Sequence, residues 1–308
     1  MSKHLIVISE DALVYEDLET LCNLPNFSHV LQESAVVEGL RTVYPTLTYP
    51  AHTSMRTGVY PARHGIVNNE TPVLCEASSV WHLYHKDVKV PDLFDAAKAA
   101  GLTTASVFWP VTRCHPSIDY LINEYWPQTP DETTLECFAA SGSSPGMMEK
   151  VIRPNAHLVD GRHRQHPHCD HFINACACAI LRTFTPNLLM IHPANIDAYR
   201  HKTGLFSPHV THGLHEIDNW LGDLLAAAED AGILQDTHFC ILGDHGQLNI
   251  QGSMHLNVLL RELGWIDVDA DGVITDYRAF CKSSGLSAQV YLKNPNDTAD
   301  CKAMYALL

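Results

Sequence analysis

The stretch His238-Phe239-Cys240-Ile241-Leu242-Gly243-Asp244-His245-Gly246 decides the fold class. Its apolar first half predicts a buried parallel strand, and an Asp-His pair follows directly at the carboxyl end of that strand. Open α/β sheets place their chemistry at this end. A neighbouring carboxylate and imidazole can bind one divalent cation such as zinc, although Asp and Gly also occur in plain turns.

The rest of the chain repeats the order strand, loop, helix. The expected strands are short apolar runs, and the segments between them show the periodicity and the end signals of helices. These strands are Leu5–Ile8, Val36–Tyr44, Thr103–Phe108, Leu188–Ile191 and Phe239–Leu242. The alternation predicts an α/β fold, with a doubly wound, mostly parallel central sheet and helices on both faces.

Two regions interrupt this alternation. Residues 129–164 are polar and loop-like, which suggests a cap or insertion near the site. Residues 265–292 suggest a small β subregion, because Trp265–Tyr277 has the composition of a hairpin and Ser287–Leu292 that of a strand. We therefore expect a single catalytic domain over residues 1–308 that carries these two additions.

Composition limits the partners and the compartment. The chain has 308 residues and a net charge of −15 with histidine neutral. Such an acidic chain is a poor clamp for duplex nucleic acid, and a phosphate-bearing substrate would need bound cations beside it. No apolar run approaches the ~20 residues of a membrane span. The 10 cysteines contain no CxxC pair, so we expect reduced thiols and a cytoplasmic protein. The sequence indicates no particular oligomeric state.

Three other strand ends carry residues that complement the Asp-His pair. Asp11 follows the first strand, either as a turn residue or as a ligand. Thr48 lies at an expected helix start, where it is either a cap or an activated nucleophile. Asp197 and His201 are four residues apart on an expected helix, either as an ordinary surface pair or as two ligands of one ion.

All four fragments lie at or just after the carboxyl end of an expected strand, so they can meet at one edge of the sheet. Together they supply three carboxylates, two imidazoles and one hydroxyl, which fits two neighbouring divalent ions better than one. The imidazoles favour zinc over magnesium. Two-metal sites hold phosphoryl oxygens, so a small phosphorylated compound is the expected substrate.

The segments Pro45–His52, Thr57–Ile66 and Val107–Pro110 resemble the nucleotide pyrophosphatase/phosphodiesterase branch of the alkaline phosphatase superfamily. The Asp–His pair at a spacing of four and the Asp-His-Gly motif fit the same pattern, which runs in order from about residue 5 to about residue 250. The resemblance implies an alkaline phosphatase-like fold and hydrolysis of phosphodiester or pyrophosphate bonds.

The resemblance also implies two zinc ions. Their ligands would be Asp11, Thr48, Asp244 and His245 for the first, and Asp197, His201 and one further histidine for the second. In the family, this further histidine belongs to a His-Gly motif near the carboxyl end of the domain. No such motif follows Gly246, so we expect a domain that is incomplete at its C-terminal side, or an incomplete second site.

Four side chains receive roles in the implied reaction. Thr48 would attack phosphorus and form a covalent phospho-threonine intermediate, which water would then hydrolyse. Asn69 would donate a hydrogen bond to a phosphate oxygen. Tyr49 and Trp109 would line the substrate pocket, although core packing is the more ordinary explanation for Trp109.

Two alternatives remain open. The first is hydrolysis of phosphomonoesters or phosphonates, or phosphate transfer, within the same superfamily. A monoester needs a nearby Arg or Lys, and neither occurs between Val43 and Met55, which favours diesters even though Arg56, Arg63 or Arg200 could reach in. The second is a catalytically impaired scaffold that lacks a third ligand at the second metal.

Overall fold

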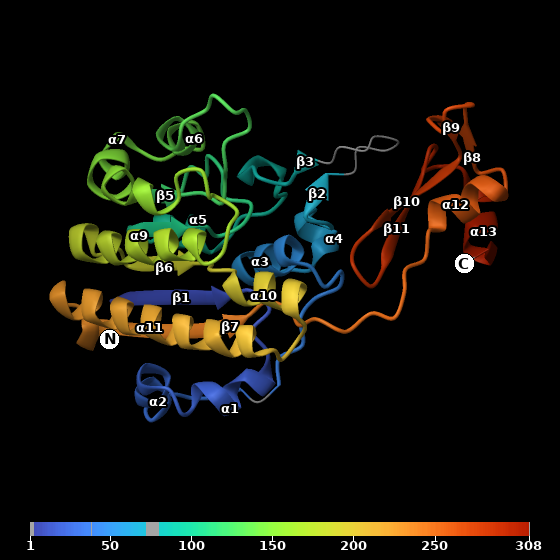
Figure 1. Cartoon of the computed structure of the whole chain (residues 1–308). Coiled ribbons are helices and arrows are strands. Elements are labelled where there is room, and N and C mark those ends of the chain that lie inside the picture. The colour runs from blue at the N-terminus through green and yellow to red at the C-terminus, as the bar shows by residue number, and fades with distance from the viewer. Residues whose placement is uncertain (1–2, 38, 72–79, 308) are drawn as a thin grey trace.

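The central feature of the computed structural model, which describes residues 3–37, 39–71 and 80–307, is a five-stranded parallel sheet (Figure 1). The strand order is β5-β4-β6-β1-β7. These strands are β1 (His4–Glu10), β4 (Thr104–Val107), β5 (Tyr120–Ile122), β6 (Leu188–Ile191) and β7 (Thr237–Gly243). Ile8 of β1 is level with both Ile191 of β6 and Ile241 of β7, so the three strands reach the same edge of the sheet.

Helices cover both faces of this sheet, which confirms the predicted doubly wound α/β architecture. Ile6 and Ile8 of β1 point into one core with the long helices α9 (His168–Phe184) and α11 (Pro208–Asp230). Because successive side chains of a strand point to opposite faces, Val7 joins a second core. That second core is covered by α3 (Thr48–Thr57) and α5 (Leu93–Ala99). Other helices of the main body include α1 (Leu18–Leu21), α2 (Pro25–Leu31), α4 (Pro61–His64) and α10 (Asn195–Thr203).

Strand β7 differs from its prediction in burial. It runs parallel to β1 as expected, but it is the last strand of the sheet among the described residues. None of its residues is fully buried, and His238 and Cys240 are exposed. An edge strand has a neighbouring strand on one side only, so its side chains are less covered than those of a central strand. An apolar run is therefore not enough to predict that a strand is fully buried.

Two further expectations about local structure are wrong. The described part of Val36–Tyr44 forms no strand, and Val37 is exposed despite its β-branched side chain. Residues 129–164 are largely helical rather than loop-like, because Phe138, Val151 and other apolar side chains of this stretch join the core beside α9. Its elements are α6 (Thr134–Ala140), α7 (Pro145–Met147), η3 (Met148–Ile152), α8 (Arg153–Asn155) and η4 (Ala156–Leu158).

The C-terminal part folds around a small core of its own and projects from the main body (Figure 1). The hairpin predicted within Trp265–Tyr277 forms from β8 and β9, and β10 pairs with β11. The elements are α12 (Leu256–Glu262), β8 (Ile266–Val268), β9 (Ile274–Tyr277), β10 (Ala279–Ser283), β11 (Ala288–Leu292) and α13 (Thr298–Leu307). Lys282 of β10 pairs with Glu70 at 2.7 Å and so connects this part to the body.

The remaining short elements connect these parts. They are η1 (Tyr15–Asp17), β2 (Glu70–Thr71), β3 (Val80–Trp81), η2 (His85–Asp87) and η5 (Leu234–Asp236). Of the helices in the described ranges, none is both long and apolar enough to cross a bilayer.

Candidate active site

Neighbouring strands bring the first predicted group together. Asp11 follows β1, and Asp244 with His245 follows β7, whose Gly243 is level with Glu10 of β1. Gly243 is required here, because a Cβ at this position would lie 2.0 Å from the carbonyl oxygen of Leu13. The glycine in the Gly-Asp-His motif therefore allows β7 to approach the turn after β1 closely, with its acid beside Asp11.

Helix α3 adds the hydroxyl. The helix begins at Thr48, and Leu47 occupies the N-cap position without a side-chain capping bond. Thr48 is therefore the first residue of the helix and not its cap, which corrects the capping alternative. Its Oγ1 lies 3.2 Å from Nε2 of His245 instead.

The distances within this group fit a divalent cation. Nε2 of His245 lies 3.4 Å from Oδ1 of Asp11 and 3.4 Å from Oδ2 of Asp244, in addition to its 3.2 Å contact with Thr48. Zinc bonds of about 2.0–2.1 Å in a tetrahedron put the ligand atoms about 3.3 Å apart. Nε2 of His245 is therefore as far from each of the three oxygens as one ligand of an ion is from another, and ligand atoms of Asp11, Asp244 and His245 all lie within 4.8 Å of one another.

Unsatisfied oxygens support the same conclusion. Oδ1 of Asp11 and Oδ2 of Asp244 are buried without a hydrogen-bond partner. The other oxygen of Asp244 accepts hydrogen bonds from the backbone N–H groups of Ala12 (3.0 Å) and His245 (2.8 Å), which fixes the carboxylate. Because a buried polar atom without a partner is costly, the two free oxygens favour a bound cation between them.

The electrostatics of Asp11 also favour a cation. Burial raises the pKa of the Asp11 carboxyl well above its ordinary value, and the negative charges of Asp244, Asp197 and Glu124 raise it further. A divalent ion would relieve this repulsion and hold the carboxylates in their charged form.

The second predicted group is more open. Asp197 and His201 lie on α10, with Oδ1 of Asp197 3.4 Å from Nε2 of His201, and Gln247 donates a hydrogen bond to the same carboxylate. Burial opposes the charge of Asp197, but His201, His245 and Gln247 together outweigh burial and lower the pKa of its carboxyl. The His201 side chain is 69% exposed. Within the described part of the chain, no third carboxylate, imidazole or thiol joins this pair closely enough to form a group of three ligands.

The other predicted residues lie around Thr48. The backbone N–H of Tyr49, the residue after Thr48, donates to Oδ1 of Asn69 at 2.9 Å, so the oxygen of the Asn69 amide is engaged. Tyr49 is 1% exposed and Trp109 is fully buried. The indole packs against the His52 ring with ring centres 4.8 Å apart, so Trp109 lies in the core, as the alternative explanation requires.

Sequence analysis missed two buried histidines beside the first group. Nδ1 of His52 lies 3.5 Å from Oδ2 of Asp244, and Nε2 of His192 lies 3.5 Å from Oδ2 of Asp11. Burial lowers the pKa of both imidazoles. His192 could have been found from the sequence, because it directly follows the strand Leu188–Ile191 and so ends at the same edge.

Glu124 is a further acid that the sequence did not single out. Burial raises the pKa of its carboxyl to about 7, against the opposing effects of Tyr49 and Arg164. The Arg164 guanidinium lies 4.5 Å from the ring centre of Trp126. An acid, a cation and aromatic rings therefore surround Tyr49.

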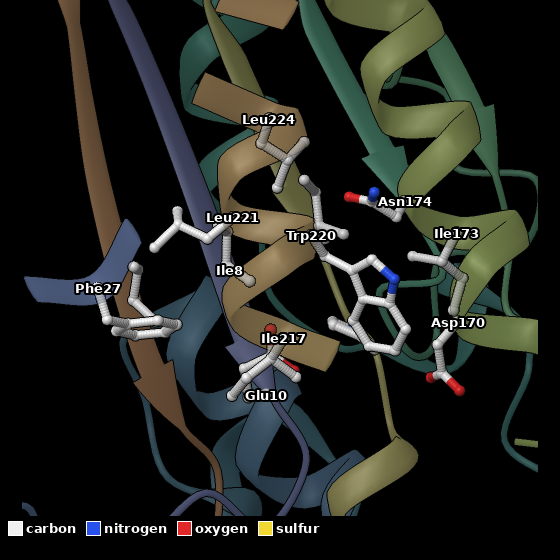
Figure 2. Close-up of a pocket in the computed structure, with 13 residues that line it drawn as sticks. Ile8, Glu10, Phe27, Asp170, Ile173, Asn174, Ile217, Trp220, Leu221 and Leu224 are labelled. Atoms are coloured by element: carbon white, nitrogen blue, oxygen red, sulfur yellow. The ribbon is translucent and has the colours of Figure 1, made fainter. Parts of the chain in front are cut away.

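A small cavity lies on the face of the sheet opposite α3 and α5, between the sheet and helices α9 and α11 (Figure 2). Its lining is mostly apolar, and the carboxylates of Glu10 and Asp170 both lie in the lower part of the view. Burial, followed by the charge of Asp170, raises the pKa of Glu10 well above its ordinary value. Glu10 thus belongs to the cavity and not to the group around His245, although it precedes Asp11 in the sequence.

Comparisons with known proteins agree on one family. Residues 5–305 match the family described as Type I phosphodiesterase / nucleotide pyrophosphatase. Ectonucleotide pyrophosphatase/phosphodiesterase 2 of Saccharomyces cerevisiae is 22% identical over 267 residues, covering 82% of this chain and 47% of the yeast protein. Family member 1 of Homo sapiens is 23% identical over 255 residues, covering 80% of this chain and 24% of the human protein. The chain therefore spans about half the length of the yeast relative and about a quarter of the human one.

One solved structure shows the same fold. Murine ectonucleotide pyrophosphatase/phosphodiesterase 5, in an inactive form in complex with AMP, matches with a TM-score of 0.65 and 17% identity. The match covers 99% of this chain and 70% of the murine one. This likeness confirms the predicted alkaline phosphatase-like α/β fold.

Proposed function

The chain belongs to the type I phosphodiesterase/nucleotide pyrophosphatase family, and we propose that it hydrolyses phosphodiester or pyrophosphate bonds of small nucleotide-like substrates through a phospho-threonine intermediate. The observation that carries the proposal is the convergence of Thr48, Asp11, Asp244 and His245 at contacts of 3.2–3.4 Å around Nε2 of His245. The murine neighbour in complex with AMP supports a nucleotide as the substrate class.

In the first step, Oγ1 of Thr48 attacks phosphorus as the P–O bond to the leaving group breaks, and a phosphoester of Thr48 forms. Thr48 is the first residue of α3, and its own backbone N–H would donate to a phosphate oxygen, since the N–H groups of Tyr49 and Ala51 are already engaged and Pro50 has none. Asn69 adds its side-chain NH2, since its oxygen already accepts from Tyr49.

In the second step, water attacks the phosphoester and Thr48 is regenerated as the phosphate monoester leaves. Asp11, Thr48, Asp244 and His245 would hold one divalent ion, and Asp197 with His201 would hold part of a second. Such ions lower the pKa of a bound hydroxyl or water and neutralise charge on phosphoryl oxygens. Zinc suits this mixture of imidazole and carboxylate ligands.

Two arginines bear on the choice between diesters and monoesters. Arg56 is fully buried and donates to Asp92 at 2.5 Å and to the Val111 carbonyl at 3.0 Å. Arg200 donates to the carboxylate of Asp17 at 2.5–2.6 Å. Both guanidinium groups are engaged in the body of the protein, so neither Arg56 nor Arg200 is free to neutralise the additional charge of a monoester.

The test is a comparison of Thr48→Ala with Thr48→Ser. With zinc present, the rate of hydrolysis of the nitrophenyl ester of a nucleoside monophosphate should fall at least about 1,000-fold in Thr48→Ala, because the nucleophile is gone. Thr48→Ser keeps a hydroxyl and should retain measurable turnover. A second measurement uses a diester that is hydrolysed slowly and is labelled in its nucleoside monophosphate part. When the reaction is stopped with acid, the label should be covalently attached to the unaltered chain and to Thr48→Ser. Equal rates in the unaltered chain and in Thr48→Ala would exclude Thr48 as the nucleophile.

A further inference from the structure

His192 is a buried histidine that the proposed reaction does not use. It directly follows β6 and is 3% exposed. Its two ring nitrogens face two different oxygens. Nδ1 lies 3.1 Å from the carbonyl oxygen of Ser9, and Nε2 lies 3.5 Å from Oδ2 of Asp11.

These two contacts place opposite demands on the ring. A carbonyl oxygen only accepts, so Nδ1 must carry the proton to bond Ser9. In the neutral ring, the lone pair of Nε2 then points at an oxygen of Asp11, which is repulsive whenever that carboxylate is ionised. A second proton would place an imidazolium in the interior, where burial disfavours charge, next to the His52 ring at a ring-centre distance of 4.1 Å.

A cation between Nε2 and Asp11 satisfies both contacts. Metal-binding histidines commonly donate the other ring N–H to a backbone carbonyl, which is the role that Ser9 has here. The separation of 3.5 Å is too long for a good hydrogen bond. It is close to the separation of about 3.4 Å between two ligands of one zinc ion with bonds of about 2.1 Å.

We propose that Asp11 Oδ2 and His192 Nε2 bind a further divalent cation, so that Asp11 bridges it to the ion held by Asp11 Oδ1, Asp244, His245 and Thr48. The chemistry of the donors, one imidazole and one carboxylate, suits zinc, cobalt(II) or manganese(II). The inference rests on the first metal group of the proposed function.

The new position is distinct from both groups described above. Towards the first group, Asp11 uses Oδ1, whereas towards His192 it uses Oδ2. The Asp197–His201 pair lies on α10 with its imidazole largely exposed, whereas His192 is buried at the end of the strand. Loss of one ion should therefore leave ligands for the others in place, apart from the shared Asp11.

The experiment counts zinc per chain by elemental analysis after chelator treatment and equilibrium dialysis against buffered zinc. The 308-residue chain is compared with His192→Phe, His192→Asn, Asp197→Asn and Asp244→Asn. His238→Asn, on the exposed side of β7, is the control for surface histidines. Both His192 variants should bind one zinc fewer than the unaltered chain, and His238→Asn the same number. Combining His192→Phe with Asp197→Asn should remove two.

An unchanged count in a folded His192 variant would overturn the inference. So would a combined variant that loses only one ion, because the two positions would then be one. If Asp244→Asn lowers the count and His192→Phe does not, the inference fails while the proposed function stands. If neither lowers it, the proposed metal chemistry fails as well. Should both His192 variants misfold, ¹⁵N spectra of the unaltered chain decide, because zinc should shift the Nε2 resonance of His192 and a lack of shift would contradict the inference.

Discussion

Two groups of metal-ligand side chains in this molecule contain the same residue types but have different surroundings. The first comprises Asp11, Asp244 and His245, and the second comprises His85, Asp92 and His115. In the first group, two buried carboxylate oxygens have no hydrogen-bond partner. In the second group, the carboxylate is fully engaged.

Asp92 shows what engages it. One oxygen accepts from Arg56 at 2.5 Å and from Nε2 of His115 at 3.0 Å. The other accepts the backbone N–H groups of Phe94 and Asp95 at the start of α5. Nδ1 of His115 accepts from the backbone N–H of Ser117, so its proton lies on Nε2 and no lone pair faces Asp92.

The difference teaches that residue type and proximity do not define a metal site. Arg56 already supplies the positive charge in the second group, and burial together with His115 and Arg56 lowers the pKa of His85 to about 4. The first group has two carboxylates and no arginine or lysine paired with them among the described residues. We therefore expect ions at the first group and a structural network at the second.

The largest expected effect on stability comes from Asp92→Asn. Asparagine keeps the capping oxygen but leaves the Arg56 guanidinium buried without a counter-charge, which should cost about 3–5 kcal/mol of unfolding free energy in urea titrations. Asp244→Asn is the matched control. Measured in EDTA, it should cost far less or even stabilise, because it removes repulsion with Asp11. Equal losses in both variants would remove the distinction between the groups.

Arg56→Met should convert the second group towards a metal site. Without the guanidinium, Asp92 and two imidazoles would remain without a cation. In an Asp244→Asn background, zinc at about 100 times its dissociation constant should raise the unfolding free energy of Arg56→Met by about 2.7 kcal/mol. The parent Asp244→Asn chain should show no comparable gain at the same zinc concentration. A gain of the same size with and without Arg56 would contradict the argument.

A smaller effect should follow from Glu124, whose charge acts on Asp11 of the first group. Its pKa rises from 4.5 to about 7 on folding, so the folded state holds the proton more tightly. This stability is present below about pH 4.5 and is lost as the pH rises through 7, with a loss of about 2–3 kcal/mol between pH 5 and pH 8. Urea titrations in EDTA at pH 5 and pH 8 should show this decline in the unaltered chain and a smaller one in Glu124→Gln. An unchanged decline in the variant would exclude Glu124 as its source.

The first group could be predicted from the sequence because its members follow strands, and the neighbouring Thr48 because it lies at the start of a helix. Parallel strands end at one edge, so residues such as Asp11 and Asp244 meet although they are 233 positions apart. The distinction between the two groups could not be predicted. The pairing of Arg56 with Asp92 depends on how α3 packs against α5, and no local pattern encodes that packing.

The burial of individual side chains was the other property that local sequence patterns did not predict. The apolar run of β7 has the composition of a central strand, yet its position at the edge of the sheet leaves Cys240 exposed. Residues 129–164 look polar on average, but their few apolar side chains, such as Phe138 and Val151, are fully buried against the core. Strand order and helix packing decide both cases.

The most direct test of the central claim is anomalous diffraction at the zinc edge from crystals of the chain grown with zinc. We predict a strong peak within bonding distance of Asp11, Thr48, Asp244 and His245, and none between His85, Asp92 and His115. A peak at the second group with none at the first would contradict the account, because the orphaned carboxylates would then not be the ligands that their geometry indicates.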